Sequence, residues 1–358
     1  MKKIFIALSV VAVLAFMVAP SSALVGIDDA VPGTDILQPF FIVSIPGVGT
    51  QDTLIVIQEI GSLGGPLSTP TGAVHWTIYD RRSIHRGDYT FRYSHFDVLP
   101  YSILWMLQTY VSSTNLAALE VDLDEDGVND HYVGYIYWDN NNDTADNLVA
   151  YQYQIDLING MAAGVAVPAK EYAPTSMGYD VRQQDDQVAP IGDGYESFSP
   201  NALAVSDWRE YLNTVPPAAW DVGWFSIYER FFLLNDSAVS WMIIWTTKAP
   251  FVAPNINLPG ALDVIVYNED EVGVSVTIPF LYELNIINVA GYLPGSWVAP
   301  VGGWFDIMIP DINGATSWAG WQDEEFLAYS YQTASSPTAS INWGALFTAH
   351  RESGTLMP

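Results

Sequence analysis

The sequence predicts an all-β protein made of two tandem antiparallel β-sandwich domains. Two observations lead to this prediction. Short apolar segments, several with a period of two residues, alternate with turns that contain Gly, Pro, Asn or Asp, as expected for strands of packed sheets. Three segments also recur in order, which we interpret as an internal duplication. Residues 40–41 match 231–232, residues 72–80 match 260–268, and residues 148–154 match 326–332.

The first half of the chain carries the patterns of about eight short strands. Residues 73–80 alternate between an apolar face and a second face, as in a half-buried strand. Residues 53–58 are apolar on both faces, as in a central strand that is covered on both sides. Residues 98–110 are apolar and fit either a strand or a short helix. The other expected strands are residues 36–44, 89–93, 132–138 and 148–158.

The second half repeats this pattern. Short strands separated by Gly, Pro and Asn or Asp turns indicate a sandwich or a barrel of antiparallel sheets. Of these we predict a sandwich of immunoglobulin-like type in each half. The strands expected in the second half are residues 225–234, 240–246, 261–268, 274–278, 282–289, 303–309, 325–332 and 339–348.

Changes in composition divide the chain into four parts. Lys2 and Lys3 precede an apolar run, and small residues follow up to Ala23, which is the pattern of a secretory signal peptide cleaved after Ala23. The apolar run is short for a membrane-spanning helix. The expected parts are a signal peptide (1–23), a first sandwich (24–172), a Pro-, Gly- and Asp-containing linker or insertion (173–217) and a second sandwich (218–358).

The composition restricts the environment and the partners of the protein. Its formal net charge of −28 repels nucleic acid and anionic membrane surfaces and attracts cations. An exported chain with no Cys depends on hydrophobic cores rather than on disulfides, with or without the help of bound metal. We therefore expect a secreted bacterial protein, extracellular or at the cell surface, with no nucleic-acid partner and no membrane span after cleavage.

The sharpest local motif is the acidic segment DLDEDGVND at residues 122–130. Aspartates stand at loop positions one, three, five and nine, and Gly127 at position six permits a sharp turn. Calcium takes six to eight oxygen ligands, and this spacing folds carboxylates and a backbone carbonyl around one ion. The alternative is a solvated acidic hairpin. The predicted ligands of a structural Ca²⁺ ion are Asp122, Asp124, Asp126, Val128 and Asp130.

The motif is not an EF-hand, because its twelfth position is Val133 instead of Glu. Over its length, the loop resembles the calcium loops of thrombospondin type 3 repeats and of integrin-type FG-GAP repeats. Without the twelfth ligand we expect a weak Kd of about 10⁻⁴ to 10⁻³ M. The matching region of the second half, residues 291–295, has no acidic loop. Further ligands are expected on the next turn, from Asp139, Asn141, Asp143 or Asp146.

Patterns that indicate catalysis are weak. The five histidines form no H-E-x-x-H motif, and the chain has no G-x-S-x-G elbow and no phosphate-binding glycine loop. A glycosidase with paired carboxylates stays open, because 40 acidic residues supply many pairs. However, we find no Asp or Glu in an apolar run that would raise its pKa. We therefore predict that the protein is not an enzyme.

The tryptophans have two interpretations. Those within expected strands, Trp76, Trp241, Trp245 and Trp343, are predicted to lie in the cores. Trp318 and Trp321 lie in a loop with Gly and polar residues. There they would pack onto their own domain, or stack on sugar rings of a bound polysaccharide.

Four segments resemble a family of uncharacterised exported bacterial proteins. The resemblance covers most of the chain after the signal peptide, and its motifs are structural instead of catalytic. It implies secretion and paired β domains, and it carries over no reaction and no functional residues. The segments are residues 36–41 (ILQPFF), 52–57 (DTLIVI), 93–98 (YSHFDV) and 343–351 (WGALFTAHR).

These observations predict a secreted, non-enzymatic structural or surface-assembly protein with a calcium site. Its expected partners are further copies of itself or other extracellular surface components. The alternative is a carbohydrate-binding protein that uses Trp318 and Trp321. Assembly predicts large particles, whereas glycan binding predicts a monomer whose tryptophan fluorescence changes with polysaccharide.

Overall fold

The computed structural model describes fifteen stretches of the chain. The predicted signal peptide (1–23) and the predicted linker (173–217) lie outside the described residues. The described residues are 35–59, 70–82, 84–94, 98–124, 126–140, 148–156, 160–167, 169–170, 224–234, 238–246, 260–282, 284–310, 326–336, 341–348 and 350–354.

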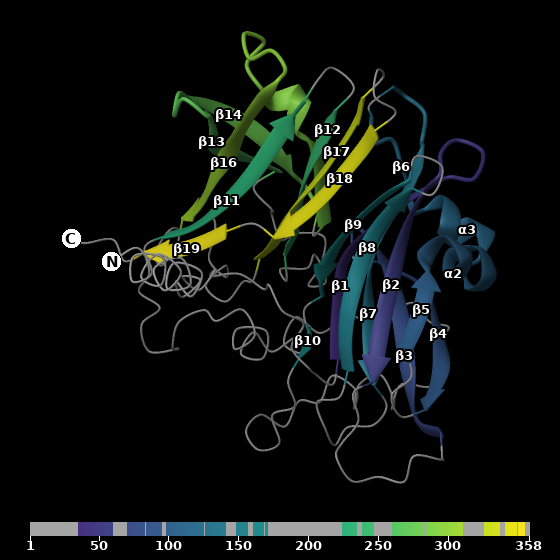
Figure 1. The fold of residues 1–358 in the computed structure, drawn as a ribbon. Coiled ribbons are helices and arrows are strands. Elements are labelled where there is room, and N and C mark those ends of the chain that lie inside the picture. Colours follow the sequence, from purple (N-terminus) through teal and green to yellow (C-terminus); the bar gives the residue numbers. More distant parts are fainter. Residues whose placement is uncertain are drawn as a thin grey trace, which may run out of the picture.

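The first unit consists of two antiparallel sheets, confirming the predicted all-β class (Figure 1). The first outer sheet has the strand order β5-β2-β8-β9. The first inner sheet has the order β10-β1-β7-β3-β4, with β6 paired to β7. The strands are β1 (Asp35–Ser44), β2 (Gln51–Glu59), β3 (Pro70–Asp80), β4 (His85–Ser94), β5 (Val98–Ser102), β6 (Glu120–Val121), β7 (His131–Asn140), β8 (Leu148–Asp156), β9 (Met161–Ala166) and β10 (Ala169–Lys170).

The second unit is also a pair of antiparallel sheets. The second inner sheet has the order β15-β12-β17-β18, and the second outer sheet has the order β14-β13-β16-β11-β19. A short 3₁₀ helix, η1 (Val289–Tyr292), follows β15. The strands are β11 (Trp224–Leu233), β12 (Val239–Thr246), β13 (Gly260–Asn268), β14 (Gly273–Phe280), β15 (Leu284–Asn288), β16 (Val301–Pro310), β17 (Phe326–Ser336), β18 (Ile341–Thr348) and β19 (His350–Gly354).

The central strands have the immunoglobulin order. In the first unit, β1, β7 and β3 lie side by side like strands B, E and D, and β2, β8 and β9 lie like C, F and G. One edge differs, because the position of strand A beside β1 is filled by β10, which comes last in the unit. The small strands β6, β9, β10 and β19 were not among the sequence predictions.

The two units share one strand order. Strands β1 to β5 correspond to β11 to β15, and strands β7 to β10 correspond to β16 to β19; β6 has no counterpart among the described strands. With these substitutions, each sheet of the first unit takes the strand order of a sheet of the second. The β3–β4 and β13–β14 turns also agree in detail. Asp80 Oδ1 accepts the N–H groups two and four residues later, at 2.8 and 3.1 Å, and Asn268 Oδ1 does the same, at 3.1 and 2.9 Å. The strand repeat is therefore present in the structure, whereas its origin by duplication stays a prediction.

Residues 98–110, which fitted a strand or a helix, form both. Strand β5 ends at Ser102, and helix α2 (Ile103–Tyr110) begins immediately after it. The Ser102 hydroxyl accepts the N–H of Trp105, and the Asp52 carboxylate accepts the N–H of Leu104, so two free amides of the first turn are satisfied. A second short helix, α3 (Ser113–Ala117), leads into β6. None of the described helices is long and apolar enough to cross a membrane.

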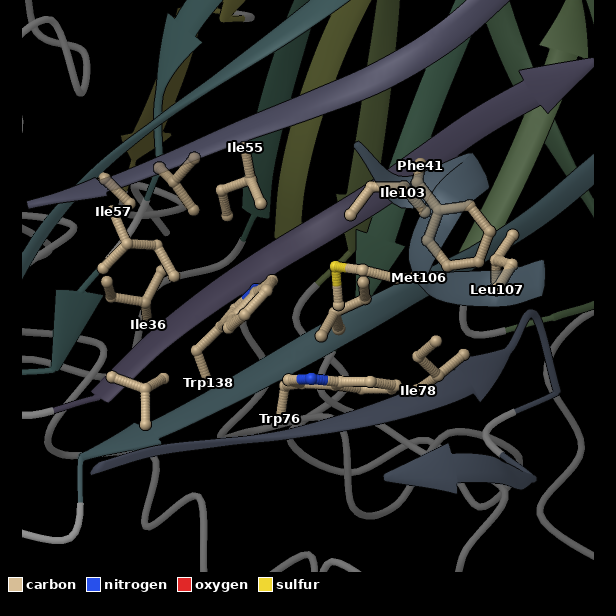
Figure 2. Close-up of a cluster of buried hydrophobic side chains, with 14 of the residues drawn as sticks. Ile36, Phe41, Ile55, Ile57, Trp76, Ile78, Ile103, Met106, Leu107 and Trp138 are labelled. Carbon is tan, nitrogen blue, oxygen red and sulfur yellow. The ribbon is translucent and has the colours of Figure 1, made fainter. Parts of the chain in front are cut away.

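Each sandwich has its own apolar core between its two sheets. In the first unit, Trp76 and Trp138 pack side by side with ring centroids 6.5 Å apart, and Met106 extends from α2 into the same cluster (Figure 2). The core of the second unit contains Phe231, Phe305 and aliphatic residues of β12, β13 and β16. Trp76, Trp241 and Trp245 are buried as predicted; the side chain of Trp343 lies outside the description.

A third apolar layer joins the two units. The outward faces of the two inner sheets pack on each other, so the four sheets stack in the order first outer, first inner, second inner, second outer. The ring centroids of Phe40 in β1 and Tyr329 in β17 lie 5.3 Å apart, and those of Tyr135 in β7 and Trp245 in β12 lie 5.9 Å apart. At one side of this layer β9 lies along β18, as Figure 1 shows.

Candidate metal centre

The acidic loop connects two paired strands. Strand β6 pairs with the start of β7, through Glu120 opposite Tyr132 and Val121 opposite His131. The N–H of Asp130 donates to the Val121 carbonyl at 3.1 Å, which closes the base of the loop. Residues 122–130 therefore project from the end of the first inner sheet on a hydrogen-bonded base.

Three of the predicted ligands converge. Asp122, Asp124 and Asp126 each offer a carboxylate oxygen within 4.8 Å of the other two, and the last two side chains are exposed. The backbone supports this arrangement, since Asp122 Oδ2 accepts the N–H of Gly127 at 2.7 Å and Asp126 Oδ1 accepts the N–H of Val128 at 2.8 Å. Gly127 has φ +93°, the left-handed conformation that glycine adopts without strain.

Asp130 has a different role from the other three aspartates. Its Oδ1 accepts the N–H of Leu123 at 3.0 Å and lies 2.9 Å from His131 Nδ1. His131 Nε2 in turn lies 3.2 Å from Gln51 Oε1, on a neighbouring part of the sandwich. Asp130 thus holds the two ends of the loop together, and the structure does not group it with the three converging carboxylates.

The prediction of further ligands from the next turn is wrong for Asp139. It lies near the far end of β7, opposite Asp35 and His75. At about 3.4 Å per strand residue, the eight steps from His131 to Asp139 place it roughly 27 Å from the loop. Asn141, Asp143 and Asp146 lie outside the described residues.

The charges of the loop act on one another. Partial desolvation raises the pKa of Asp124, and the charges of Asp126 and Asp130 and the Asp122 side chain raise it further, whereas the N–H of Asp126 lowers it. A bound cation would relieve this repulsion, because it favours the ionised form of each carboxylate. The chemistry of the loop is therefore that of a hard-cation ligand set, with carboxylate oxygens as donors.

The histidines do not form a second cluster within the described residues. Among these residues, the three loop aspartates are the group whose donor atoms lie close enough to share an ion. His85 lies 3.4 Å from Asp88, and His131 contacts Asp130. His95 lies outside the described residues.

One carboxyl group contradicts the sequence prediction that no acidic residue stands in an apolar run. Glu229 lies in the middle of β11 and is only 1 % exposed. Burial raises its pKa well above the usual value, and the backbone amide of Ile243 lowers it by less. The signal was visible in the sequence, because the Glu alternates with Ile227 and Phe231 on one face of the strand. Glu229 is therefore a group of the sandwich core.

The loop tryptophans of the carbohydrate hypothesis, Trp318 and Trp321, lie outside the described residues. The structure therefore neither brings them together nor separates them.

Comparisons with known proteins give no functional lead. No protein-family model and no curated protein matches the chain. Among solved structures, an α-L-rhamnosidase of Streptomyces avermitilis aligns at 7 % identity with a TM-score of 0.21, over 94 % of this chain and 27 % of that one. The viral chemokine binding protein R17 of rodent gammaherpesvirus Peru aligns at 8 % identity with a TM-score of 0.17, over 89 % of this chain and 88 % of that one. Both scores are too low to carry an argument.

Proposed function

We propose that this protein is a secreted, non-enzymatic structural or surface-assembly protein whose loop at residues 122–130 holds a structural Ca²⁺ ion. The observation that carries the proposal is the convergence of the Asp122, Asp124 and Asp126 carboxylates within 4.8 Å. They lie on a loop whose base is fixed by strand pairing. An ion held there would stabilise the loop against the repulsion of its own charges.

The ligands of the ion are assigned by chemistry. Three carboxylates supply up to six oxygens, which meets the requirement of calcium for six to eight when the Val128 carbonyl or water completes the shell. Asp130 acts in this proposal as the residue that closes the loop through Leu123 and His131. The expected affinity stays weak, with a Kd of about 10⁻⁴ to 10⁻³ M, which matches extracellular calcium sites.

The scaffold supports a structural role more than a catalytic one. The described carboxyl whose pKa is raised furthest, Glu229, is sealed inside the second sandwich. The large apolar layer between the units joins them into one stack of sheets. The shared strand order and the matched Asp80 and Asn268 turns support an origin by duplication.

Calcium binding is tested by titration calorimetry with the purified mature protein. Heat of binding is expected for the natural chain and is expected to be lost in the double variant Asp124→Asn, Asp126→Asn. Asp263→Asn is the matched control, because Asp263 is an exposed strand carboxylate in the other unit. Equal binding by the double variant would contradict the site.

Assembly is tested by light scattering of the mature protein with calcium and with a chelator. Particles larger than one chain, which shrink in chelator, are expected. A monomer under both conditions would contradict the assembly role. The carbohydrate alternative would then lead, and it predicts a fluorescence change on polysaccharide that Trp318→Ala and Trp321→Ala remove.

A further inference from the structure

The layer between the two units joins unlike faces of equivalent sandwiches. By strand order, the second inner sheet is the counterpart of the first outer sheet, and the second outer sheet is the counterpart of the first inner sheet. We call the outward face of the first inner sheet the receiving face and that of the second inner sheet the inserting face. These two faces pack on each other inside the molecule. Their counterparts lie at its opposite ends: the outward face of the second outer sheet corresponds to the receiving face, and that of the first outer sheet corresponds to the inserting face.

The second outer sheet repeats the central feature of the receiving face. In the internal layer, Tyr79 of β3 and Tyr135 of β7 are cross-strand partners whose rings stack, with centroids 5.1 Å apart and an angle of 14° between the ring planes. At the equivalent position of the second outer sheet, Tyr267 of β13 and Trp304 of β16 are partners whose rings stack at 5.2 Å and 18°. The first pair is buried beneath Trp245, whereas Tyr267 and Trp304 are partly exposed.

The first outer sheet repeats the inserting face. Tyr329 and Tyr331 of β17, which are buried in the internal layer, correspond to Tyr151 and Tyr153 of β8. Their cross-strand partners also correspond, since Ile243 pairs with Tyr329 and Val56 pairs with Tyr151. Tyr151 is 41 % exposed.

The sequence of β2 agrees with a covered position for this face. Residues 53–58 are apolar on both faces, which is typical of a strand packed on both sides. In the structure, Ile55 and Ile57 are fully buried in the sandwich core, whereas Leu54 and Val56 on the opposite side are only half-buried. A second layer of protein is thus expected on the outward side of the first outer sheet.

We infer that copies of this protein associate head to tail, with the second outer sheet of one copy packed on the first outer sheet of the next. The contact repeats the one that joins the two units internally. Unlike faces that meet in this way form a heterologous interface, which extends into a filament unless the rotation closes a ring. The inference rests on the proposed assembly function and names its partner, a second copy of this chain, and the two surfaces that meet.

The internal contacts define the expected ones. The strand register shifts the sequence match of 40–41 with 231–232 by one residue, because Phe41 lies opposite Gly134 and Phe231 lies opposite the equivalent Gly303. Arg230 therefore stands at the position of Phe40, which contacts Tyr329. By this equivalence Arg230 of one copy faces the Tyr151 ring of the next in a cation–π arrangement. Trp304 of the first copy similarly faces Gln58 of the next, because Gln58 stands where Trp245 does in β12. These pairs are more polar than the internal ones, as is usual for an interface between molecules that also exist separately.

The net charge of −28 opposes the association of copies. Repulsion between like-charged copies is screened by salt and is reduced by cations bound at the acidic loop. Larger particles are therefore expected as salt or calcium is raised, and smaller ones in chelator at low salt.

The test uses two variants that each block one face. Tyr151→Arg places a charge opposite Arg230, and Ile265→Arg places a charge beside the Tyr267–Trp304 pair. Both positions are exposed, at 41 % and 40 %, so both variants are expected to fold. Val48→Arg, at a 59 % exposed position in the β1–β2 turn, is the control. Masses are measured by analytical ultracentrifugation at one fixed salt and calcium concentration.

Each variant alone is expected to be a monomer, and an equimolar mixture of the two is expected to give a two-chain species and nothing larger, since each chain keeps one usable face. The control variant is expected to assemble like the natural chain. Suppose that the natural chain assembles, but that either blocking variant forms particles of the same size or the mixture stays monomeric. The assignment of faces is then wrong, while the assembly function stands. If the natural chain itself is a monomer under all conditions, both are wrong.

Discussion

At the scale of single residues, two glycines mark the same backbone contact in both units. A Cβ atom on Gly134 of β7 would overlap the backbone carbonyl of Tyr79, and one on Gly303 of β16 would overlap the carbonyl of Tyr267. Because the obstacle is backbone rather than the end of a side chain, it cannot move without shifting a strand. The need for glycine therefore comes from the approach of neighbouring strands.

We predict that Gly134→Ala and Gly303→Ala each lower the free energy of unfolding by about 1–3 kcal/mol, the usual cost of forcing an extra group into a packed site. Gly291→Ala is the control, because nothing lies within 4 Å of a Cβ there. Its effect should stay within about 0.5 kcal/mol. Urea unfolding followed by circular dichroism measures all three, and equal stabilities would contradict the prediction.

Glu229 gives a prediction about pH. Since burial raises its pKa in the folded state, the folded protein holds this proton to a higher pH than the unfolded chain does. The stabilising contribution of the protonated group is complete below the unfolded pKa, near the usual value of 4.5, and is lost as the pH rises toward the folded pKa.

The variant Glu229→Gln removes the ionisable group and keeps the shape. It is expected to be more stable than the natural protein by about 1–3 kcal/mol or more at alkaline pH, because an ionised carboxylate left in the core costs more than a neutral amide. The difference is expected to be smaller at pH 4. Thermal unfolding of both proteins across this range tests it. A constant difference at all pH values would show that ionisation of Glu229 is not the cause.

At the scale of elements, the β6–β7 connection combines a rigid base with a charged tip. The strand pairing and the Asp130 contacts hold the ends, whereas the carboxylates of Asp122, Asp124 and Asp126 converge at the exposed tip. The sequence indicated the convergence of these three carboxylates, because the spacing of acidic residues around one glycine is a local property, whereas the bound ion stays a prediction. The sequence failed for Asp139, because the direction of β7 separates residues that are close in sequence.

Calcium affinity is expected to fall as the pH is lowered. The raised pKa of Asp124 means that a proton competes with the ion at a higher pH than for an isolated aspartate, so binding is weakened as the pH approaches that value. Titrations at pH 7.5 and pH 5 measure this, with Asp124→Asn expected to bind weakly at both. An affinity that does not change between the two values would place the ion elsewhere.

A second element repeated in both units is a buried polar bridge between the sheets. In the first, Thr53 Oγ1 donates to the carbonyl of Ile42 at 3.0 Å and Gln154 Nε2 donates to Thr53 Oγ1 at 2.8 Å. In the second, Gln332 Nε2 donates to the carbonyl of Arg230 at 3.1 Å. Polar residues at these inward positions conflict with a simple alternating pattern, and only the approach of the opposite sheet explains them.

At the scale of the whole molecule, the apolar layer between the units makes them interdependent. Trp241, Trp245, Tyr329 and Tyr331 would be exposed if the second unit stood alone, since they pack on the first inner sheet. Burial in this layer raises the pKa of Tyr331, and the charge of Asp156 in the first unit raises it further. We therefore expect the two sandwiches to unfold together.

Unfolding followed by far-ultraviolet circular dichroism and by tryptophan fluorescence should give coincident transitions, the behaviour of one cooperative body. Trp245→Ala is expected to lower the free energy of unfolding by about 3–5 kcal/mol, as for other buried Trp. It is also expected to separate the transition followed by circular dichroism from the one followed by fluorescence. Trp105→Ala, at a 47 % exposed position, is the control. Two separate transitions in the natural protein would contradict the interdependence of the units.

The sequence by itself determined the all-β class, most strand positions, the repeat of strand patterns and the acidic loop, because alternation, turn residues and ligand spacing are local properties of the chain. The tertiary structure alone decided how the sandwiches stack, which outward faces are covered and why Glu229 and Gln154 stand at inward positions. Those features depend on which sheet lies opposite a residue. Alternation along a strand shows that one face is apolar, but only the packing of distant segments shows whether that face is covered by the same chain.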